Sequence, residues 1–442
     1  MPAPGRTAER IEKMNKGFDT LRYGSQGAGV RRLQLALCRA GFSDDDPDGE
    51  FGNSTVKAVR LFRAAHGLEP SGEADSAVFE LANVYLEGFI RVRLKPRDTF
   101  YRLGKKFGVS ADAVAAANPG LDPADLSQGR EAVIPLPFAV TPKKTPIDSA
   151  LAACAVRGLA ARYPFIRLEE YGKSVLGRPL FALSFGRGKE LLISAAVHAN
   201  EWITATLLLD FAESIAGAYA GRGTFQGRSA AALLSRVRLT LCPLANPDGV
   251  DLVTGALPRG AYEAARRIAE GHPDLPFPSG WKANISGVDL NLNFPVRHGA
   301  ALAAKRPLGV SGPAPRDWAG EAALCAPETS ALADLTKRLD PFAVIALHTQ
   351  GGEVLWKSDL EEAPAGAERM AEAMAEAAGY EARTVESEHA NGGWRDWFAA
   401  EFRRPGFTVE AGRGANPLPL SQYGELRAEV FPLIVTAMRL AQ

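Results

Sequence analysis

One apolar run restricts the fold of this chain more than any other stretch. Residues 191–197 carry no charge, and their length and composition indicate a strand buried on both faces. The run ends abruptly at His198, Glu201 follows three residues later, and an apolar helical pattern covers 203–216. Open α/β sheets build sites from polar groups at the carboxyl ends of their strands. We therefore predict that His198 and Glu201 lie at a sheet edge and bind a zinc ion.

Three further apolar runs also end in polar side chains. They are 237–245 before Asn246, 342–347 before His348, and 407–409 before Glu410. Helical patterns at 327–339 and 365–378 lie between them. This alternation predicts an α/β domain with a doubly covered, mostly parallel (mixed) sheet, in which strand ends distant in sequence meet at one edge.

The residue types at these strand ends suit hydrolysis. Two imidazoles and a carboxylate form a three-ligand zinc site that leaves a fourth position for water. Zinc lowers the pKa of water towards neutrality, and a nearby carboxylate can pass the released proton to a leaving amine. Asp289 is expected to accept a hydrogen bond from the second ring nitrogen of His198 and so fix its tautomer.

Five motifs stand in the order found in the zinc carboxypeptidase-like family. They are His198-x-x-Glu201, Asn246-Pro-Asp-Gly249, Gly287-Val-Asp-Leu-Asn291, His348-Thr-Gln350 and Phe407-Thr-Val-Glu410. Residues 150–442 resemble the bacterial γ-D-glutamyl-L-diamino acid endopeptidases of this family, which cut peptidoglycan stem peptides. The resemblance implies a zinc metallopeptidase with one zinc ion, held by His198, Glu201 and His348. It implies Glu410 as general base and acid.

The same resemblance predicts where the substrate binds. Residues 391–397 look like the substrate-pocket segment of the family, and we expect substrate contacts from Asn291, Lys282, Gly393 and Glu388. The carboxylate of Glu388 would suit the cationic end of a diamino acid. The implied target is the γ-D-glutamyl bond to diaminopimelate or lysine, and the residues do not choose between these two.

Two positions depart from the family. Leu292 stands where carboxypeptidases have an arginine that binds a substrate carboxylate, and Ser286 stands where the endopeptidases commonly have an arginine near the oxyanion. Loss of a preorganised oxyanion donor costs roughly two to three orders of magnitude in rate. The candidate replacements are Lys282, Arg297, Arg316 and Arg395. A broader metallocarboxypeptidase, disfavoured by Leu292, and a catalytically silent peptidoglycan-binding protein, disfavoured by the complete ligand and base set, remain the alternatives.

The N-terminal third predicts two small domains. Residues 1–89 contain three helical patterns and resemble a type-1 peptidoglycan-binding domain, through phrases such as Pro47-Asp-Gly-Glu-Phe-Gly-Asn53. This domain has a second HxxE, at His66, which we interpret as an ordinary histidine at a helix end. Residues 90–140 predict a strand–helix–helix–strand unit that resembles a LysM domain, which implies binding of N-acetylglucosamine-containing glycans. A linker at 141–149 then leads to the peptidase domain, 150–442.

Composition limits the partners. Fifty-one basic and 51 acidic residues leave no net field to attract nucleic acid or a membrane surface, so we expect peptidoglycan glycan and stem peptides as partners. Four cysteines without a CxxC pair indicate free thiols. We see no signal peptide and no apolar run of roughly 18 residues that would span a bilayer. A cytoplasmic location is the expectation, with release to the wall or a spore as the alternative.

Overall fold

The computed structural model describes residues 20–126, 129–358, 362–385 and 392–441. The chain divides into two compact units, Met1–Val140 and Thr141–Gln442.

From residue 20 onward, the described part of the first unit opens with three helices, as predicted. They are α2 (Ala28–Arg39), α3 (Asn53–Ala65) and α4 (Ser76–Glu87). Their apolar faces meet at fully buried residues such as Leu37 and Phe62. His66 Nδ1 lies 2.8 Å from the carbonyl oxygen of Phe62, and its ring packs on the Phe62 ring. The histidine of this HxxE is therefore part of a helix end.

A strand–helix–helix–strand unit follows. Its elements are β1 (Phe89–Arg93), α5 (Phe100–Phe107), α6 (Ala111–Ala117) and β2 (Glu131–Pro135), with β1 and β2 antiparallel. Thr99 and Ser110 cap the two helices through their hydroxyls, because each accepts a hydrogen bond from a backbone N–H of the first turn. The order of elements is the predicted one, and the LysM assignment remains a prediction.

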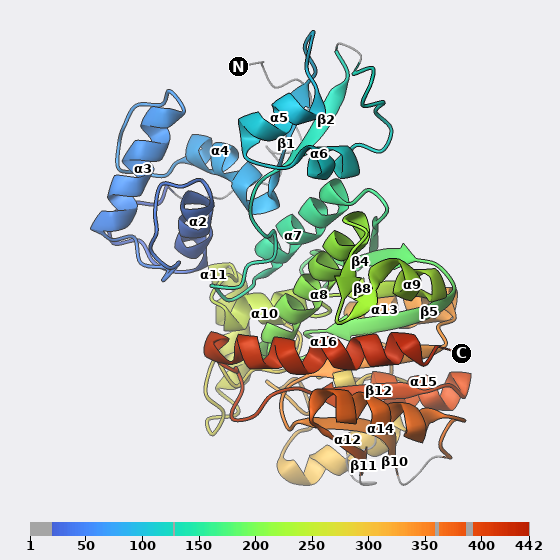
Figure 1. The fold of residues 1–442 in the computed structure, drawn as a ribbon. Helices are drawn as coiled ribbons and strands as arrows, with labels where there is room; N and C mark the ends of the chain where they lie inside the picture. The colour runs from blue at the N-terminus through green and yellow to red at the C-terminus, as the bar shows by residue number, and fades with distance from the viewer. Residues whose placement is uncertain (1–19, 127–128, 359–361, 386–391, 442) are drawn as a thin grey trace. The chain divides into compact units, whose positions relative to one another are not determined.

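The second unit is built on an eight-stranded sheet of order β11-β10-β12-β9-β5-β8-β4-β3 (Figure 1). The strands are β3 (Arg167–Lys173), β4 (Pro179–Gly186), β5 (Lys189–Ala195), β8 (Val237–Cys242), β9 (Ala343–His348), β10 (Glu353–Ser358), β11 (Glu381–Val385) and β12 (Gly406–Glu410). Four neighbouring pairs are parallel and three are antiparallel. The sheet is mixed, and its central strands are the four predicted ones.

Helices cover the sheet. Helices α13 (Pro327–Leu339) and α15 (Trp394–Phe402) pack around Leu192 and Val344 of the central strands. Helix α8 (Ile203–Ala220) packs against β5, and α14 (Ala367–Ala378) packs against β10 and β11. Helix α16 (Tyr423–Arg439) packs on α8 and α14. Outside these layers the described unit has the further α-helices and short strands α7 (Ser149–Arg162), β6 (Thr224–Phe225), β7 (Arg228–Ser229), α9 (Ala230–Arg236), α10 (Pro247–Val253), α11 (Arg259–Ala269) and α12 (His298–Lys305). The observed architecture confirms the α/β fold class.

Register places the functional strand ends together. In the parallel pair β9 and β12, His348 lies opposite Glu410, and Leu347 lies opposite Ala195 of β5. The strand that leads to His198 therefore ends at the same edge as the strands that carry His348 and Glu410.

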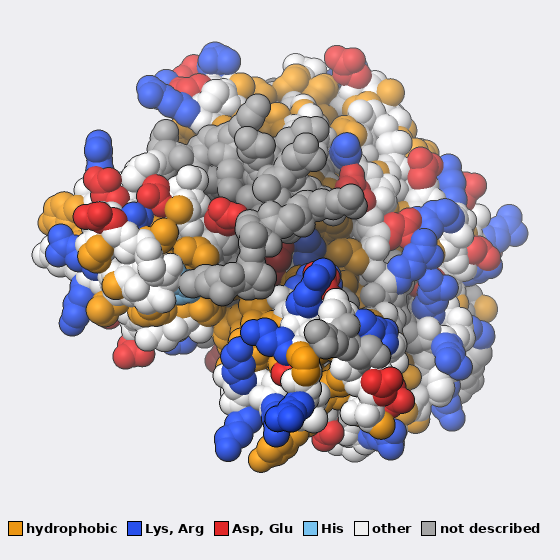
Figure 2. Space-filling model, turned by 90° about the horizontal axis from the view of Figure 1, so that it is seen from above, with side chains coloured by type: hydrophobic (Ala, Val, Ile, Leu, Met, Phe, Trp, Pro, Cys, Tyr) orange, Lys and Arg blue, Asp and Glu red, His pale blue; other side chains and the backbone are white. Residues whose placement is uncertain are grey.

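The surface agrees with the balanced composition. Acidic and basic side chains intermingle on the described parts of the face in Figure 2. Within the described structure, the four cysteines form no disulfide bond. Among the residues described, no helix combines the length and apolar character needed to cross a membrane.

Candidate metal centre and active site

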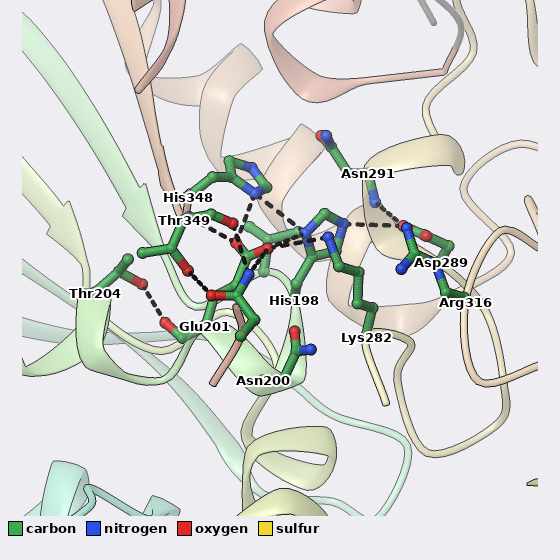
Figure 3. A network of polar contacts seen from close by, with 12 residues as sticks. His198, Asn200, Glu201, Thr204, Lys282, Asp289, Asn291, Arg316, His348 and Thr349 are labelled. Atoms are coloured by element: carbon green, nitrogen blue, oxygen red, sulfur yellow. Dashed lines mark hydrogen bonds and ion pairs between the residues drawn. The ribbon is translucent and has the colours of Figure 1, made fainter. Parts of the chain in front are cut away.

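A tight turn after β5 presents the first two predicted ligands. His198 follows the strand, and Glu201 ends a 3₁₀ turn, η1 (Ala199–Glu201), directly before α8. The hydroxyl of Thr204 donates to the carbonyl of Glu201 and accepts from the N–H of Ala196, a residue with a positive φ of 49°. These bonds fix the turn, so both functional side chains point to one side (Figure 3).

Three ligand atoms converge at this point. His198 Nδ1 and His348 Nδ1 each lie 2.9 Å from a different oxygen of Glu201, and the two nitrogens lie 3.2 Å apart. When the other ring nitrogen carries the proton, each imidazole directs a lone pair from Nδ1 at this point. Two lone pairs and a carboxylate repel one another unless they surround a cation. The donor set, two imidazoles and one carboxylate, suits zinc.

The local charges also favour a cation. Burial alone would lower the pKa of His198, but the carboxylates of Glu201 and Asp289 outweigh it and raise this pKa to about 9. Burial would raise the pKa of Glu201, yet the charges of His198, Lys282 and His348 hold it well below its usual range. The centre therefore keeps Glu201 ionised and stabilises positive charge.

Asp289 lies where the sequence predicted. Its Oδ1 atom is 3.2 Å from His198 Nε2 and accepts the backbone N–H of Asn291, while its Oδ2 accepts the backbone N–H of Asp317. A proton on Nε2 of His198 then points at a carboxylate, and the lone pair on Nδ1 is left for a metal. Asp289 can thus set the tautomer of His198.

Glu410 ends β12 beside His348, consistent with the predicted general base. Burial raises the pKa of Glu410, and the nearby carboxylate of Glu201 raises it further. The positive charges of His348 and Lys282 lower it, but the net pKa stays above the usual value. A carboxyl group whose pKa is raised above its usual range accepts a proton more readily and can return it to a leaving group.

Three of the four predicted substrate contacts lie near this centre. Lys282 Nζ is 3.3 Å from Glu201 Oε1, and its side chain is 19% exposed (Figure 3). The N–H of Asn291 is bonded to Asp289, and a Cβ built on Gly393 would lie 3.5 Å from Asn291 Oδ1. Glu388 lies outside the described residues.

The candidate replacements for the missing arginines fall in different places. Lys282 reaches the metal centre itself. Arg316 pairs with Asp317 at 2.9 Å and is 40% exposed. Arg297 and Arg395 both act on Asp396, because their charges oppose the rise in its pKa that burial causes. Only Lys282, among these four, lies within ion-pair distance of a predicted ligand in the described structure.

Sequence reasoning missed two partners of Glu201. The backbone N–H of Thr349 donates to Oε2 at 3.2 Å, and the side-chain amide of Asn416 lies 3.5 Å from Oε1. Thr349 sits inside the His348 motif, so its position was accessible from the sequence. Asn416 is 215 residues from Glu201 and carries no motif that would have found it.

Comparison with known proteins matches this geometry. The family model of the zinc carboxypeptidases matches residues 154–430, and a peptidoglycan binding domain model matches residues 26–81. The chain is 38% identical over 286 residues to "Gamma-D-glutamyl-L-diamino acid endopeptidase 1" of Lysinibacillus sphaericus, covering 64% of this chain and 70% of that protein. It is 36% identical over 269 residues to "Uncharacterized protein YqgT" of Bacillus subtilis (strain 168), covering 60% and 69%.

A solved structure shows the same fold. Thrombin activatable fibrinolysis inhibitor superimposes with a TM-score of 0.53 at 20% identity, over 67% of this chain and 74% of that one. The family match spans most of the second unit, and the three ligand side chains it needs are assembled there. The chain therefore belongs to the zinc carboxypeptidase family and is a zinc-dependent metallopeptidase that also carries a peptidoglycan-binding domain.

Proposed function

We propose that this metallopeptidase hydrolyses the γ-D-glutamyl–diamino acid bond of peptidoglycan stem peptides. In this proposal His198, Glu201 and His348 hold the zinc ion, and Glu410 is the general base and acid. The observation that carries it is the convergence of two imidazole nitrogens and a carboxylate within 4.8 Å, at the strand end shared with Glu410.

The surrounding side chains have separate tasks. Zinc bound by such ligands polarises carbonyl groups and lowers the pKa of water. Glu410 takes up the proton of the attacking water and delivers it to the leaving amine of the diamino acid. The ammonium of Lys282 lies at the centre and stabilises the developing oxyanion. It takes the place of the arginine that the endopeptidases have at the position of Ser286. Asn291 and Gly393 contact the substrate backbone beside Asp289.

The relatives and the first unit support this substrate class. A relative sharing 38% identity is named for cleavage of γ-D-glutamyl-L-diamino acid bonds, and residues 26–81 match a peptidoglycan-binding model. We further propose that the chain comprises domains 1–89, 90–140 and 150–442 with a linker at 141–149, and that 90–140 is a LysM domain. Both N-terminal domains would then hold the enzyme on glycan strands. The cellular location and the role of Glu388 remain predictions.

The test is cleavage of a defined stem peptide. The zinc-loaded protein is incubated with L-Ala-γ-D-Glu-meso-diaminopimelate, and the products are followed by mass spectrometry. We expect release of L-Ala-D-Glu and free diaminopimelate. Glu410→Gln should abolish this release while retaining zinc, because glutamine cannot accept the proton. Glu169→Gln, which removes a carboxylate on the edge strand β3, is the matched control and should cleave normally.

Other outcomes separate the alternatives. Cleavage of N-acyl dipeptides with ordinary α-peptide bonds, without cleavage of the γ-D-glutamyl bond, would support a broader carboxypeptidase. Stoichiometric zinc without any cleavage would support a silent peptidoglycan-binding protein, the reading that Ser286 and Leu292 favour. Cleavage that persists in Glu410→Gln would contradict the assigned base.

A further inference from the structure

A side-chain amide and a hydroxyl hold each other beside the metal centre. The hydroxyl of Thr349 donates to Asn416 Oδ1 at 2.7 Å, and Asn416 Nδ2 donates to the carbonyl oxygen of Thr349 at 2.8 Å. A carbonyl oxygen can only accept, so the NH₂ end of the amide must face it. Thr349 is buried, which leaves this closed ring of two hydrogen bonds little room to turn. The amide of Asn416 is therefore held in one orientation.

The pair directs one N–H group at each carboxylate oxygen of Glu201. The backbone N–H of Thr349 donates to Oε2 at 3.2 Å, beside the metal centre (Figure 3). Asn416 Nδ2 makes a longer contact of 3.5 Å with Oε1. An amide NH₂ has two donor hydrogens, so Nδ2 can serve the Thr349 carbonyl and Glu201 together. The two oxygens of Glu201 are thus held by two donors that are themselves joined.

Lys282 also contacts Glu201, but with less control over its geometry. Its Nζ atom lies 3.3 Å from Oε1. An ammonium at the end of a flexible four-carbon chain can follow a carboxylate that turns. A backbone N–H and an amide fixed by two hydrogen bonds cannot follow in this way. The Thr349–Asn416 pair is therefore better suited than Lys282 to set the plane of the Glu201 carboxylate.

The segment that carries Asn416 begins at the predicted general base. Glu410 is the last residue of β12, and the backbone N–H of the next residue, Ala411, donates to the carbonyl oxygen of His348 at 2.9 Å. On the other side of Asn416, the side chain of Leu418 is buried in the second unit. The segment is therefore anchored before and after Asn416, and its amide connects the chain that leaves the base with the carboxylate of a predicted ligand.

We propose that Asn416, held by Thr349, is a positioning residue that orients the carboxylate of Glu201 for zinc. This inference rests on the proposed function, in which Glu201 is a zinc ligand. Hydrogen-bond partners of a ligating group hold it in the geometry that the metal needs, and their loss typically lowers metal affinity about 10- to 100-fold. The same contact ties the segment that follows Glu410 to the metal centre.

The test measures zinc affinity and the visible absorption spectrum of the cobalt(II) form in variants of the full chain. Asn416→Leu keeps the branched shape of the side chain and removes its hydrogen bonds. Thr349→Val removes only the hydroxyl that holds the amide, whereas Thr349→Ser retains it. Zinc affinity is obtained by competition with a chromophoric chelator, and the cobalt(II) absorption bands report how the ligands are arranged around the metal.

The expected losses differ among the variants. Asn416→Leu should bind zinc about 10- to 100-fold more weakly, and Thr349→Val about 5-fold more weakly, the equivalent of one ordinary hydrogen bond. Both should shift the cobalt(II) bands, whereas Thr349→Ser should match the wild type in both measurements. Asn118→Leu is the matched control, because Asn118 also forms hydrogen bonds with backbone groups but belongs to the first unit, which carries no predicted zinc ligand. It should change neither measurement.

The outcomes separate this inference from the assignment of the ligands. Wild-type zinc affinity and an unchanged cobalt(II) spectrum in Asn416→Leu would overturn it, and a lower melting temperature alone would mean that Asn416 only supports the fold. If Asn416→Leu does not fold, the two Thr349 variants decide, and equal zinc affinities in Thr349→Val and Thr349→Ser would overturn the inference. Glu201→Ala should lose zinc in every case. Wild-type zinc affinity in Glu201→Ala would overturn the ligand set of the proposed function, and the inference with it.

Discussion

Replacement of Asp289 by asparagine tests how the protein prepares its metal ligand. The carboxylate accepts on both oxygens: Oδ1 faces His198 Nε2 and the N–H of Asn291, and Oδ2 accepts the N–H of Asp317. An asparagine has one acceptor oxygen and one donor nitrogen. In either orientation the NH₂ group of the asparagine must face a group that donates a hydrogen bond to the carboxylate of Asp289.

Both orientations have a cost that can be estimated. If the NH₂ group faces Asp317, a buried backbone N–H loses its acceptor, which destabilises the site by about 1–3 kcal/mol. If it faces His198, the imidazole must accept at Nε2, its proton moves to Nδ1, and the lone pair aimed at the metal is lost. Loss of such an orienting partner typically lowers metal affinity about 10- to 100-fold. We expect Asp289→Asn to bind zinc more weakly by this factor.

The assay is competition for zinc with a chromophoric chelator, at fixed pH and ionic strength. The matched control is Asp317→Asn, which removes a nearby carboxylate paired with Lys305 and keeps the backbone N–H that bonds Asp289. Its zinc affinity should stay close to that of the wild type. Equal affinities in Asp289→Asn and the wild type, or an equal loss in both variants, would refute the orienting role.

Two further predictions concern packing and pH. Gly392 has a φ of 77°, and a Cβ at this position would lie 2.3 Å from the carbonyl oxygen of Leu292. Gly392→Ala should therefore lower the free energy of unfolding by more than about 1 kcal/mol. Urea titration measures this, and an unchanged free energy would contradict the prediction. Burial, together with the nearby Asp148, raises the pKa of Asp251 from 3.8 to about 6. The folded state therefore retains a proton that the unfolded state loses between about pH 4 and 6, so this group makes stability fall as pH rises through that window, by about 3 kcal/mol in total. Asp251→Asn should flatten the profile, measured by melting temperature from pH 4 to 7, and an unchanged slope would exclude Asp251 as its source.

The central strands were predictable because both of their faces are buried. The strands before His198, His348 and Glu410 are almost wholly buried, and such strands appear in a sequence as uninterrupted apolar runs. Each run stops where the sheet edge meets the site, so the polar residue that follows was identifiable. Parallel pairing then brings these residues together without any knowledge of the loops.

The outer strands gave no such signal. β3 and β11 are half-exposed at the sheet margins, and their sequences, Arg167–Lys173 and Glu381–Val385, mix charged and apolar residues without a clear period. The position of Lys282 depends on the path of a long loop, whose backbone is fixed by bonds to Ala199 and Pro315. Loop paths of this kind arise from tertiary contacts, and no local pattern encodes them.

The positions of the cations bear on whether the two departures from the family silence the enzyme. An arginine at 292 would place positive charge beside Asn291, close to the reacting bond, and Leu292 removes it. Lys282 supplies positive charge at Glu201 instead. In the proposed function, Lys282 takes the place of the missing arginine beside the developing oxyanion. Glu410→Gln should then abolish cleavage of the γ-D-glutamyl bond while zinc stays bound, and a silent site could not show this loss.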